Sequence, residues 1–400
     1  MSATHCRLVK LGLATALGLT PEKNWNRITA GDVSHLTVRD DLIPGEERLF
    51  GVVTDPLPPI PEALASYDCR CNQLALSAFE NIRAEVEAAL QQYGADRIGI
   101  VMGSSTVGVA ETEDVLRKRH VSGESPNQVD VTQLEYRILS DFIQETSGAT
   151  GPCYVLSTAC STGAKVLGAA RRLLDMGICD AVISGASDSL CGLTANGFHS
   201  LQALSSDVLN PMSLNRDGLI LGEAAALFLL TREPGGIQLL GVGESSDAHH
   251  ISSPLPDGAG AYRAMEACLA DSGLTTVDIA YLNLHGTGTP QNDSMETAAV
   301  HRLFGDRVPC SSTKPLVGHT LGASGAVEAA FCWLVLANRS NDELTLPPHV
   351  YDGVTDPELA PLSLVGAGQT AKVQNRAALL SNSFGFGGSN CSVVLADSPS

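Results

Sequence analysis

The 400-residue chain is poor in basic residues, because 25 lysines and arginines stand against 44 acidic residues and leave a net charge of −19. Nucleic-acid binding needs clustered lysine and arginine to contact the phosphates, so this composition argues against a nucleic-acid-binding protein. Uninterrupted apolar runs of about 18 residues are also missing, which excludes a membrane-spanning helix. The acidic excess by itself indicates no more than a well-solvated surface.

Cysteine pairs with metal-binding spacing are missing too, although the chain contains 11 cysteines. No CxxC motif occurs, and Cys69 and Cys71 are separated by a single residue, so we expect no structural zinc site. An odd number of cysteines scattered through a chain of this length indicates free thiols, which fits a reducing, cytoplasmic setting.

The N-terminal stretch raises the question of a leader sequence. Residues 8–19 are mostly apolar and contain Ala14-Thr15-Ala16, which is typical of a signal-peptide cleavage site. Lys10 interrupts the stretch, however, and residues 8–13 fit a first buried strand equally well. We favour the strand.

Glycine is plentiful, with 39 residues, whereas aromatic residues make up only 4%, and we interpret this combination as a tightly wound α/β protein. Apolar runs bounded by glycine alternate with longer helical patterns, which predicts mostly parallel sheets covered by helices. Predicted strands span residues 8–13, 97–103, 153–156, 180–185, 225–230, 279–284 and 391–396. Predicted helices span residues 72–93, 162–176, 261–272 and 294–304, and residues 338–374 are expected to form irregular surface loops.

The chain reads as two similar halves. In the first half a strand ends at Ser157 and a helix follows Cys160, and in the second half a strand ends in His285 and a helix again follows. A turn-rich segment, Glu233–Gly236, lies between them. We therefore place an N-terminal half at residues 1–235 and a C-terminal half at residues 236–400.

Cys160 is the strongest candidate nucleophile. It stands between an apolar strand and a helix that starts near Thr162, among small residues that let a bulky substrate approach. A cysteine in this turn points into a crevice at the positive end of the helix dipole, which favours the thiolate. Thiolates attack thioesters and other carbonyls, so the position predicts covalent catalysis. For the other cysteines a role as small buried hydrophobic residues is the better interpretation.

Three further motifs carry polar groups at strand ends or in glycine-rich loops. His285 opens HGTGTP at the end of a predicted strand, although a single histidine in such a place is often structural. Lys314 and His319 lie in KPLVGHTLGASGA, which lacks the spacing of a nucleotide-binding loop. Residues 382–390, NSFGFGGSN, lead into a strand and are suited to supply a backbone N–H to an oxyanion.

The combination of these four motifs resembles the β-ketoacyl-acyl carrier protein synthases. The likeness extends to residues 215–223 and 246–254, so it covers nearly the whole chain, and the two histidines place it with the elongating members. It implies a thiolase-like α/β fold in which duplicated βαβαβαββ halves form a layered αβαβα core. It also implies an acyltransferase that catalyses the decarboxylative condensation of an enzyme-bound acyl group with malonyl-acyl carrier protein, giving 3-oxoacyl-acyl carrier protein and CO₂.

The resemblance also implies residue roles. Cys160 would carry the acyl group, His285 and His319 would bond to the malonyl thioester oxygen, and Lys314 would act on the histidines. The backbone N–H groups of Cys160 and Phe384 would hold the oxyanion, and the Phe384 side chain would gate the acyl pocket. The supporting acids would be Glu328, Glu296 and Asp293. The substrate-binding residues would be Thr287, Thr289, Ser252, Phe386 and, at the acyl tunnel across the dimer, Thr106.

The same likeness sets the expected partners. Substrates would arrive on acyl carrier protein, whose phosphopantetheine arm makes a metal or a dissociable cofactor unnecessary. Because the carrier and this chain are both acidic, docking needs a local basic patch. The candidates for that patch are Arg117, Lys118 and Arg119, with Arg171 and Arg172 as alternatives. A homodimer is expected, or a heterodimer with a related synthase-like subunit.

The sequence leaves the pathway and two other classes open. Residues 57–62 and 71–75 look closer to elongating synthases of bacterial aryl polyene clusters, with general fatty acid elongation as the competing interpretation. A thiolase acting on coenzyme A esters would need a second cysteine near the C-terminus, where Cys391 lies in a strand and fits poorly. The presence of Cys160, His285 and His319 argues against a non-catalytic chain-length-type subunit. A cysteine hydrolase, a weaker alternative, would release free acid.

Overall fold

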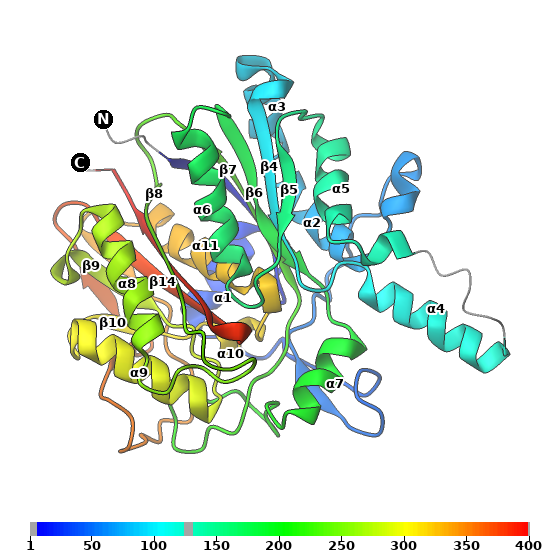
Figure 1. The fold of residues 1–400 in the computed structure, drawn as a ribbon. Helices are drawn as coiled ribbons and strands as arrows, with labels where there is room; N and C mark the ends of the chain where they lie inside the picture. The colour runs from blue at the N-terminus through cyan, green and yellow to red at the C-terminus, as the bar shows by residue number, and fades with distance from the viewer. Residues whose placement is uncertain (1–5, 124–130, 399–400) are drawn as a thin grey trace.

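The computed structural model describes residues 6–123 and 131–398 of the chain (Figure 1). Its strands are β1 (Arg7–Ala14), β2 (Thr37–Arg39), β3 (Arg48–Phe50), β4 (Ile98–Gly103), β5 (Cys153–Leu156), β6 (Ala181–Asp188), β7 (Ala224–Thr231), β8 (Gln238–Ser246), β9 (Ile279–Asn283), β10 (Pro309–Ser311), β11 (Glu343–Thr345), β12 (Ser363–Leu364), β13 (Thr370–Lys372), β14 (Ala378–Gly385) and β15 (Ser389–Ala396). Its α-helices are α1 (Pro21–Ala30), α2 (Arg70–Glu80), α3 (Arg83–Tyr93), α4 (Val109–Ser122), α5 (Arg137–Ser147), α6 (Thr162–Asp175), α7 (Gly192–Ser200), α8 (Ala259–Ser272), α9 (Pro290–Phe304), α10 (Lys314–Val317) and α11 (Ser324–Ala337).

One large sheet runs through the molecule, with the strand order β12-β10-β9-β14-β15-β8-β1-β7-β6-β4-β5. It consists of two parts that join where β1 meets β8. There Arg7 pairs with Gln238, and the N–H of Leu8 donates to the Ile237 carbonyl at 2.8 Å. The apolar stretch near the N-terminus is therefore the buried strand β1, paired with β7.

The two parts of the sheet repeat one strand order. Numbered along the chain within each part, the strands are arranged 3-2-4-5-1, as β5-β4-β6-β7-β1 and as β10-β9-β14-β15-β8. In both parts the first three strands pair in parallel, and the last two pairings are antiparallel. The predicted duplication of βαβαβαββ units is confirmed. The boundary between residues 235 and 236 stays a prediction.

Helices cover the outer faces of both parts and fill the space between them (Figure 1). On one outer side α2 packs on β1 and β7, on the other α8 packs on β8 and β15, and α6 and α11 pack on each other in the middle. These are the five predicted layers, αβαβα. α11 is apolar on almost every side because it lies in the middle layer. No helix within the described ranges is long and apolar enough to cross a bilayer.

Glycines bring α6 and α11 into direct contact. A Cβ atom at Gly163 would lie 2.3 Å from the Ala326 nitrogen, and one at Gly325 would lie 2.6 Å from the Ala164 nitrogen. A larger side chain at either position would push the helices apart. Because α6 directly follows Cys160 and α11 carries Glu328, this contact fixes the distance between two parts of the candidate site.

Two predicted elements differ from the structure. The helix expected over residues 72–93 is two helices, α2 and α3, because the chain turns between them and places the side chain of Ile82 in the core. Residues 338–374, expected to be surface loop, contain the short strands β11, β12 and β13, and Leu344 and Val365 are buried.

Candidate active site

Cys160 lies in a tight turn between β5 and α6, as predicted. β5 ends at Leu156, and Ala159 adopts a left-handed conformation with a φ of 53°, which is uncommon for a residue other than glycine. The turn places Cys160 just before α6, where it is buried and lines a cavity. Backbone strain of this kind concentrates at functional sites.

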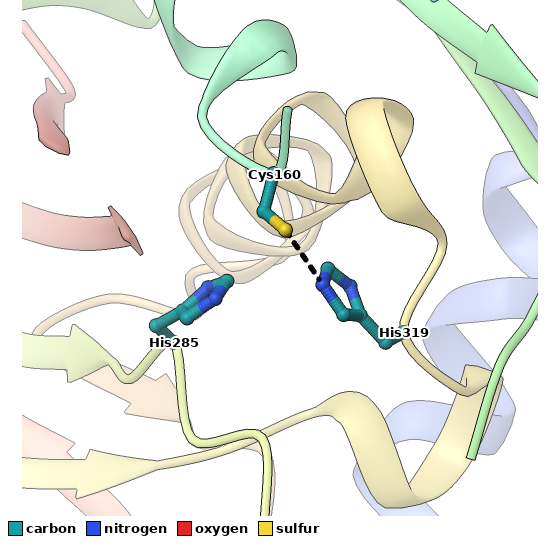
Figure 2. A group of neighbouring side chains, drawn as sticks. All are labelled: Cys160, His285 and His319. Atoms are coloured by element: carbon teal, nitrogen blue, oxygen red, sulfur yellow. Dashed lines mark hydrogen bonds between the residues drawn. The ribbon is translucent and has the colours of Figure 1, made fainter. Parts of the chain in front are cut away.

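Two histidines from the C-terminal part of the chain lie next to Cys160 (Figure 2). His285 follows the end of β9, and His319 follows α10. The Nε2 atom of His319 is 3.0 Å from the Cys160 sulfur. The ring centres of the two histidines are 5.4 Å apart, and the rings are almost perpendicular. The fold therefore brings together three residues that the sequence shows in three separate motifs.

Lys314 is buried and bridges His285 and Glu328. Its Nζ atom donates to the His285 carbonyl at 2.5 Å and to the His285 Nδ1 atom at 3.2 Å, and it forms an ion pair with Glu328 on α11. Because Nδ1 accepts this bond, the proton of the neutral His285 ring is on Nε2. Lys314 thus fixes the tautomer in which His285 can donate a hydrogen bond from Nε2.

The two histidine rings are neutral at physiological pH. Burial, reinforced by the nearby charge of Lys314, lowers the pKa of both His285 and His319 well below the usual value for histidine. The Nδ1 atom of His319 is buried and has no hydrogen-bond partner among the described residues. Either nitrogen of that ring can therefore carry the proton, so Nε2 can accept a proton in one step and donate one in another.

Contrary to the sequence-based prediction, the helix dipole does not make Cys160 a thiolate. Burial raises the pKa of the Cys160 thiol to about 11, and the backbone N–H of Phe386 and the charge of Lys314 oppose this only in part. A rise of that size corresponds to about 2.7 kcal/mol. The interaction with a helix end contributes about 0.3–1 kcal/mol, so desolvation outweighs the dipole. Cys160 is a thiol at rest, with His319 in position to accept its proton.

Two of the three predicted supporting acids hold the backbone of the turn that carries His285. Glu296 accepts hydrogen bonds from the N–H groups of His285 and Gly286, both at 2.7 Å. Asp293 accepts one from the N–H of Gly288 at 3.2 Å. Burial raises the pKa of Glu296 to about 7 and also raises the pKa of Asp293. These hydrogen bonds run to the backbone of the turn, so the two acids position His285.

The cavity in front of Cys160 contains most of the predicted substrate-binding residues. Thr287, Thr289 and Ser252 lie on its wall, and the hydroxyl oxygens of the two threonines are 2.9 Å apart. Residues on its wall that the sequence did not single out include Phe198, Leu201, Asp247, Gln291, Asn292 and Asn390. Asp247 and Asn390 lie within the segments 246–254 and 382–390 quoted above, whereas the others come from separate loops and helices outside those motifs.

Phe384 and Phe386 both line the cavity, but the predicted backbone N–H comes from the second of them. The backbone N–H next to the Cys160 sulfur belongs to Phe386, not to Phe384. Phe384 is still paired with Asn390 in the ladder between β14 and β15, whereas Phe386 follows the end of β14. The Phe384 side chain is buried, with its ring 5.9 Å from that of His285. The Phe386 ring is 38% exposed and lies 5.3 Å from that of Phe198 at the cavity wall.

Among the predicted substrate-binding residues Thr106 does not line this cavity, and the three predicted carrier-contact residues lie elsewhere. Thr106 is fully buried, and its hydroxyl donates to Asp188 at 2.9 Å, so within this chain it contacts a carboxylate instead of the space in front of Cys160. Arg117, Lys118 and Arg119 lie on α4, which extends away from the body of the molecule (Figure 1). Their contact with a carrier protein stays a prediction.

The geometry of the site also bears on whether it could bind a metal ion and on whether Cys391 could serve as the second cysteine of a thiolase. The Cys160 sulfur and one nitrogen from each histidine lie within 4.8 Å of one another, a spacing that one metal ion could span. Lys314 works against such binding, because its bond to Nδ1 of His285 leaves the ring proton on Nε2. Cys391, considered as the second cysteine of a thiolase, is fully buried in β15 and does not line the cavity.

Comparison with known families matches both halves of the chain. Residues 67–234 match the N-terminal domain of β-ketoacyl synthase, and residues 237–347 match its C-terminal domain. A 3-oxoacyl-[acyl-carrier-protein] synthase 2 from Staphylococcus aureus is 31% identical over 345 residues, covering 81% of this chain and 83% of that protein. The chain belongs to the β-ketoacyl synthase family.

The chain is also similar to other 3-oxoacyl synthases and ketosynthases, both in sequence and in fold. The 3-oxoacyl-[acyl-carrier-protein] synthase 2 of Rhizobium meliloti is 40% identical over 265 residues, a match that spans 61% of the length of each protein. Among solved structures, a ketosynthase in complex with its chain length factor from Xenorhabdus doucetiae has a TM-score of 0.92 and 38% identity, covering 99% of this chain and 98% of that one. A β-ketoacyl synthase from Burkholderia phymatum has a TM-score of 0.86 and 27% identity, covering 99% and 100%. The predicted thiolase-like fold is confirmed.

Proposed function

We propose that the chain is a 3-oxoacyl-acyl carrier protein synthase. It condenses an acyl group held on Cys160 with malonyl-acyl carrier protein and releases 3-oxoacyl-acyl carrier protein and CO₂. The observation that carries the proposal is the convergence of a buried thiol and two neutral histidines at one cavity, with His319 Nε2 3.0 Å from the sulfur. Family membership supports it.

The first half-reaction transfers the acyl group to Cys160. His319 accepts the thiol proton at Nε2 as the sulfur attacks the carbonyl carbon of the acyl thioester. The bond to the carrier's sulfur then breaks, and the departing thiolate takes the proton from His319. The carrier leaves with a free thiol, and Cys160 is left carrying the acyl group as a thioester.

The second half-reaction forms the new carbon–carbon bond. Loss of CO₂ from the malonyl group places negative charge on the thioester oxygen, where His285 donates from Nε2 in the tautomer that Lys314 fixes. His319 donates the second hydrogen bond from Nε2. The carbanion attacks the acyl carbonyl on Cys160, and the backbone N–H groups of Cys160 and Phe386 hold the resulting oxyanion. Its collapse expels the Cys160 thiolate, which takes up one proton from water and returns to the thiol.

The cavity fits a substrate that arrives on a flexible arm. The hydroxyls of Thr287, Thr289 and Ser252 lie where they can bond to the amides of a phosphopantetheine arm. The arm is covalently part of the carrier protein, so the reaction requires no dissociable cofactor and no metal. We place the reaction in the cytoplasm, which agrees with free cysteines throughout the described chain.

For partners we propose acyl carrier protein and a second synthase-type subunit, either another copy of the chain or a chain-length-type relative. The structure from Xenorhabdus doucetiae is a ketosynthase bound to its chain length factor, and it aligns with 99% of this chain. This neighbour favours the heterodimer. The same likeness, together with residues 57–62 and 71–75, leads us to place the chain in aryl polyene elongation, with fatty acid elongation as the alternative.

The test is to incubate the purified chain, with and without a co-expressed chain-length-type subunit, with acyl- and malonyl-loaded carrier proteins. Wild type is expected to give 3-oxoacyl-carrier and CO₂, whereas His285→Ala and His319→Ala give neither while staying folded. Free acid as the product would instead indicate a hydrolase. A protein that is inactive under both conditions would be a non-catalytic subunit. Offering saturated and conjugated polyenoyl carriers in parallel distinguishes the two pathways.

A further inference from the structure

Asp188 is a buried carboxylate that the mechanism above does not use. It is the last residue of β6, it is fully buried, and within the described residues it forms no ion pair with lysine or arginine. Its two oxygens accept hydrogen bonds from two different loops of the chain. A buried charge without a cation needs such a set of donors to be tolerated.

The Oδ1 atom holds the loop that follows β4. It accepts from the Ser104 hydroxyl at 2.9 Å, the Ser105 N–H at 2.7 Å, the Thr106 N–H at 2.8 Å and the Thr106 hydroxyl at 2.9 Å. The Thr106 hydroxyl oxygen in turn accepts from the N–H of Ser189 at 3.0 Å. The four groups of Ser104, Ser105 and Thr106 all donate to Oδ1, so the loop is built around an acceptor.

The Oδ2 atom holds the segment that connects His319 to α11. It accepts from the N–H of Ala323 at 2.9 Å, one residue before α11 begins. Between His319 and Ala323 the chain is strained, because Leu321 adopts a left-handed φ of 54°. Gly322 packs tightly between the Ser105 hydroxyl and the carboxylate, since a Cβ atom there would lie 2.4 Å from Ser105 Oγ and 2.7 Å from Oδ2.

We propose that Asp188 is a positioning residue that sets the placement of His319 and of the start of α11. By anchoring Ala323, its carboxylate holds the strained segment in the conformation that keeps His319 Nε2 beside the Cys160 sulfur. It also favours the N-terminus of the helix that carries Glu328, through the helix dipole. The expected effect on the condensation rate rests on the proposed function, because that function assigns His319 its role.

Asp188→Asn tests selectively whether the Asp188 carboxylate positions the segment between His319 and α11. An asparagine amide keeps one acceptor oxygen and replaces the other with an NH₂ group. Four donors face the Oδ1 position and one faces Oδ2, so the amide oxygen is expected at Oδ1 and the NH₂ group against the N–H of Ala323. The loop that follows β4 then stays in place while the anchor of the His319 segment is lost. Ser184→Ala is the matched control, because it removes a buried hydroxyl bond, to the Val166 carbonyl at 3.2 Å, on the same strand.

Two readouts are measured on the intact protein, together with the melting temperature. The first is the rate of Cys160 alkylation by iodoacetamide, followed by peptide mass spectrometry, which reports the His319–Cys160 contact whatever reaction the protein catalyses. The second is kcat and KM for condensation. We expect Asp188→Asn to lower the alkylation rate and kcat about 10- to 100-fold with KM within about twofold of wild type. Ser184→Ala should leave both rates unchanged at a similar melting temperature.

The inference is overturned if Asp188→Asn alkylates and condenses at wild-type rates, or if Ser184→Ala slows both as much. If wild type does not condense but Asp188→Asn still slows alkylation, the positioning role stands and the proposed function fails. Should Asp188→Asn not fold, Gly322→Ala, whose methyl group would press on both Ser105 Oγ and Asp188 Oδ2, is judged by the same two rates.

Discussion

Gly385 leaves the space in which the proposed oxyanion sits, so Gly385→Ala is the most specific perturbation of the site. A Cβ atom at this position would lie 3.1 Å from the Thr158 carbonyl oxygen and 3.2 Å from the backbone nitrogens of Cys160 and Ser161. An oxyanion must lie about 2.7–3.1 Å from its donor nitrogens, so the methyl group would occupy nearly the same shell around the Cys160 N–H. The variant should therefore remove one of the two proposed donors.

The expected loss follows from what one such donor contributes. Removing a single oxyanion donor lowers kcat by about 100- to 1,000-fold, or about 2.7–4 kcal/mol of transition-state stabilisation. Gly385 has a φ of −105°, which alanine adopts without strain, and its three tight backbone contacts require the neighbouring turn to shift by only a few tenths of an ångström. We therefore expect Gly385→Ala to lower kcat strongly and the melting temperature only slightly.

The assay compares kcat for condensation and the melting temperature of Gly385→Ala with those of wild type. Gly366→Ala is the control, because the nearest atom to its added methyl group is 3.9 Å away. A Gly385→Ala variant that condenses within threefold of wild type would refute the proposal that the Cys160 N–H faces the oxyanion. An equal loss of activity in Gly366→Ala would show that the assay reports stability alone.

Three further predictions concern the buried ionisable residues Lys314, Cys160 and His319. Lys314→Met leaves Glu328 unpaired and should cost about 3–5 kcal/mol of stability, measured by urea denaturation. The double variant Lys314→Met with Glu328→Gln should regain most of that stability but not the condensation rate. A double variant that is as destabilised as the single one would contradict the ion pair. Because the pKa of Cys160 is about 11, its alkylation rate should rise about tenfold per pH unit from pH 7.5 to 9.5, and a plateau near pH 8 would contradict the buried thiol. His319 stays neutral in the fold but is protonated in the unfolded chain below its usual pKa of about 6.5, so its contribution to stability falls as pH falls below that value. His319→Gln should therefore lose less stability than wild type between pH 7 and 5, by up to about 1.4 kcal/mol per pH unit, and identical losses would contradict the assignment.

The fold was predictable because its signals are local. Apolar runs bounded by glycine marked strands such as β4 and β6, and the topological echo between the segments around Cys160 and His285 predicted two similar halves. The break between α2 and α3 was not predictable from residues 72–93 alone, because the segment between them contains neither glycine nor proline and Ile82 beside the break is buried only in the tertiary structure. Periodicity cannot show where a helix must bend to follow a sheet.

The site was predictable only in part. Cys160, His285, Lys314 and His319 each stand in a distinctive motif, and the structure brings all four together. The pKa of Cys160 was not predictable, because desolvation depends on everything packed around the sulfur. The N–H of Phe386 and not that of Phe384 faces Cys160 because Phe384 is still paired within the β14–β15 ladder, whose end the sequence did not predict. Asp188 was not predictable because it lies in no recognisable motif and its hydrogen-bond donors come from two loops that are distant in the sequence.

The central claim is that Cys160 carries the acyl group in a condensation, and intact-mass spectrometry of the enzyme tests it most directly. Wild type and Cys160→Ala are each incubated with acyl-carrier protein and then with malonyl-carrier protein. We predict that wild type alone gains the acyl mass, and that malonyl-carrier then discharges it as a carrier-bound product extended by two carbons. Acylation of Cys160→Ala to the same extent, or a wild type that no carrier-bound chain acylates even with a chain-length-type subunit present, would contradict the account.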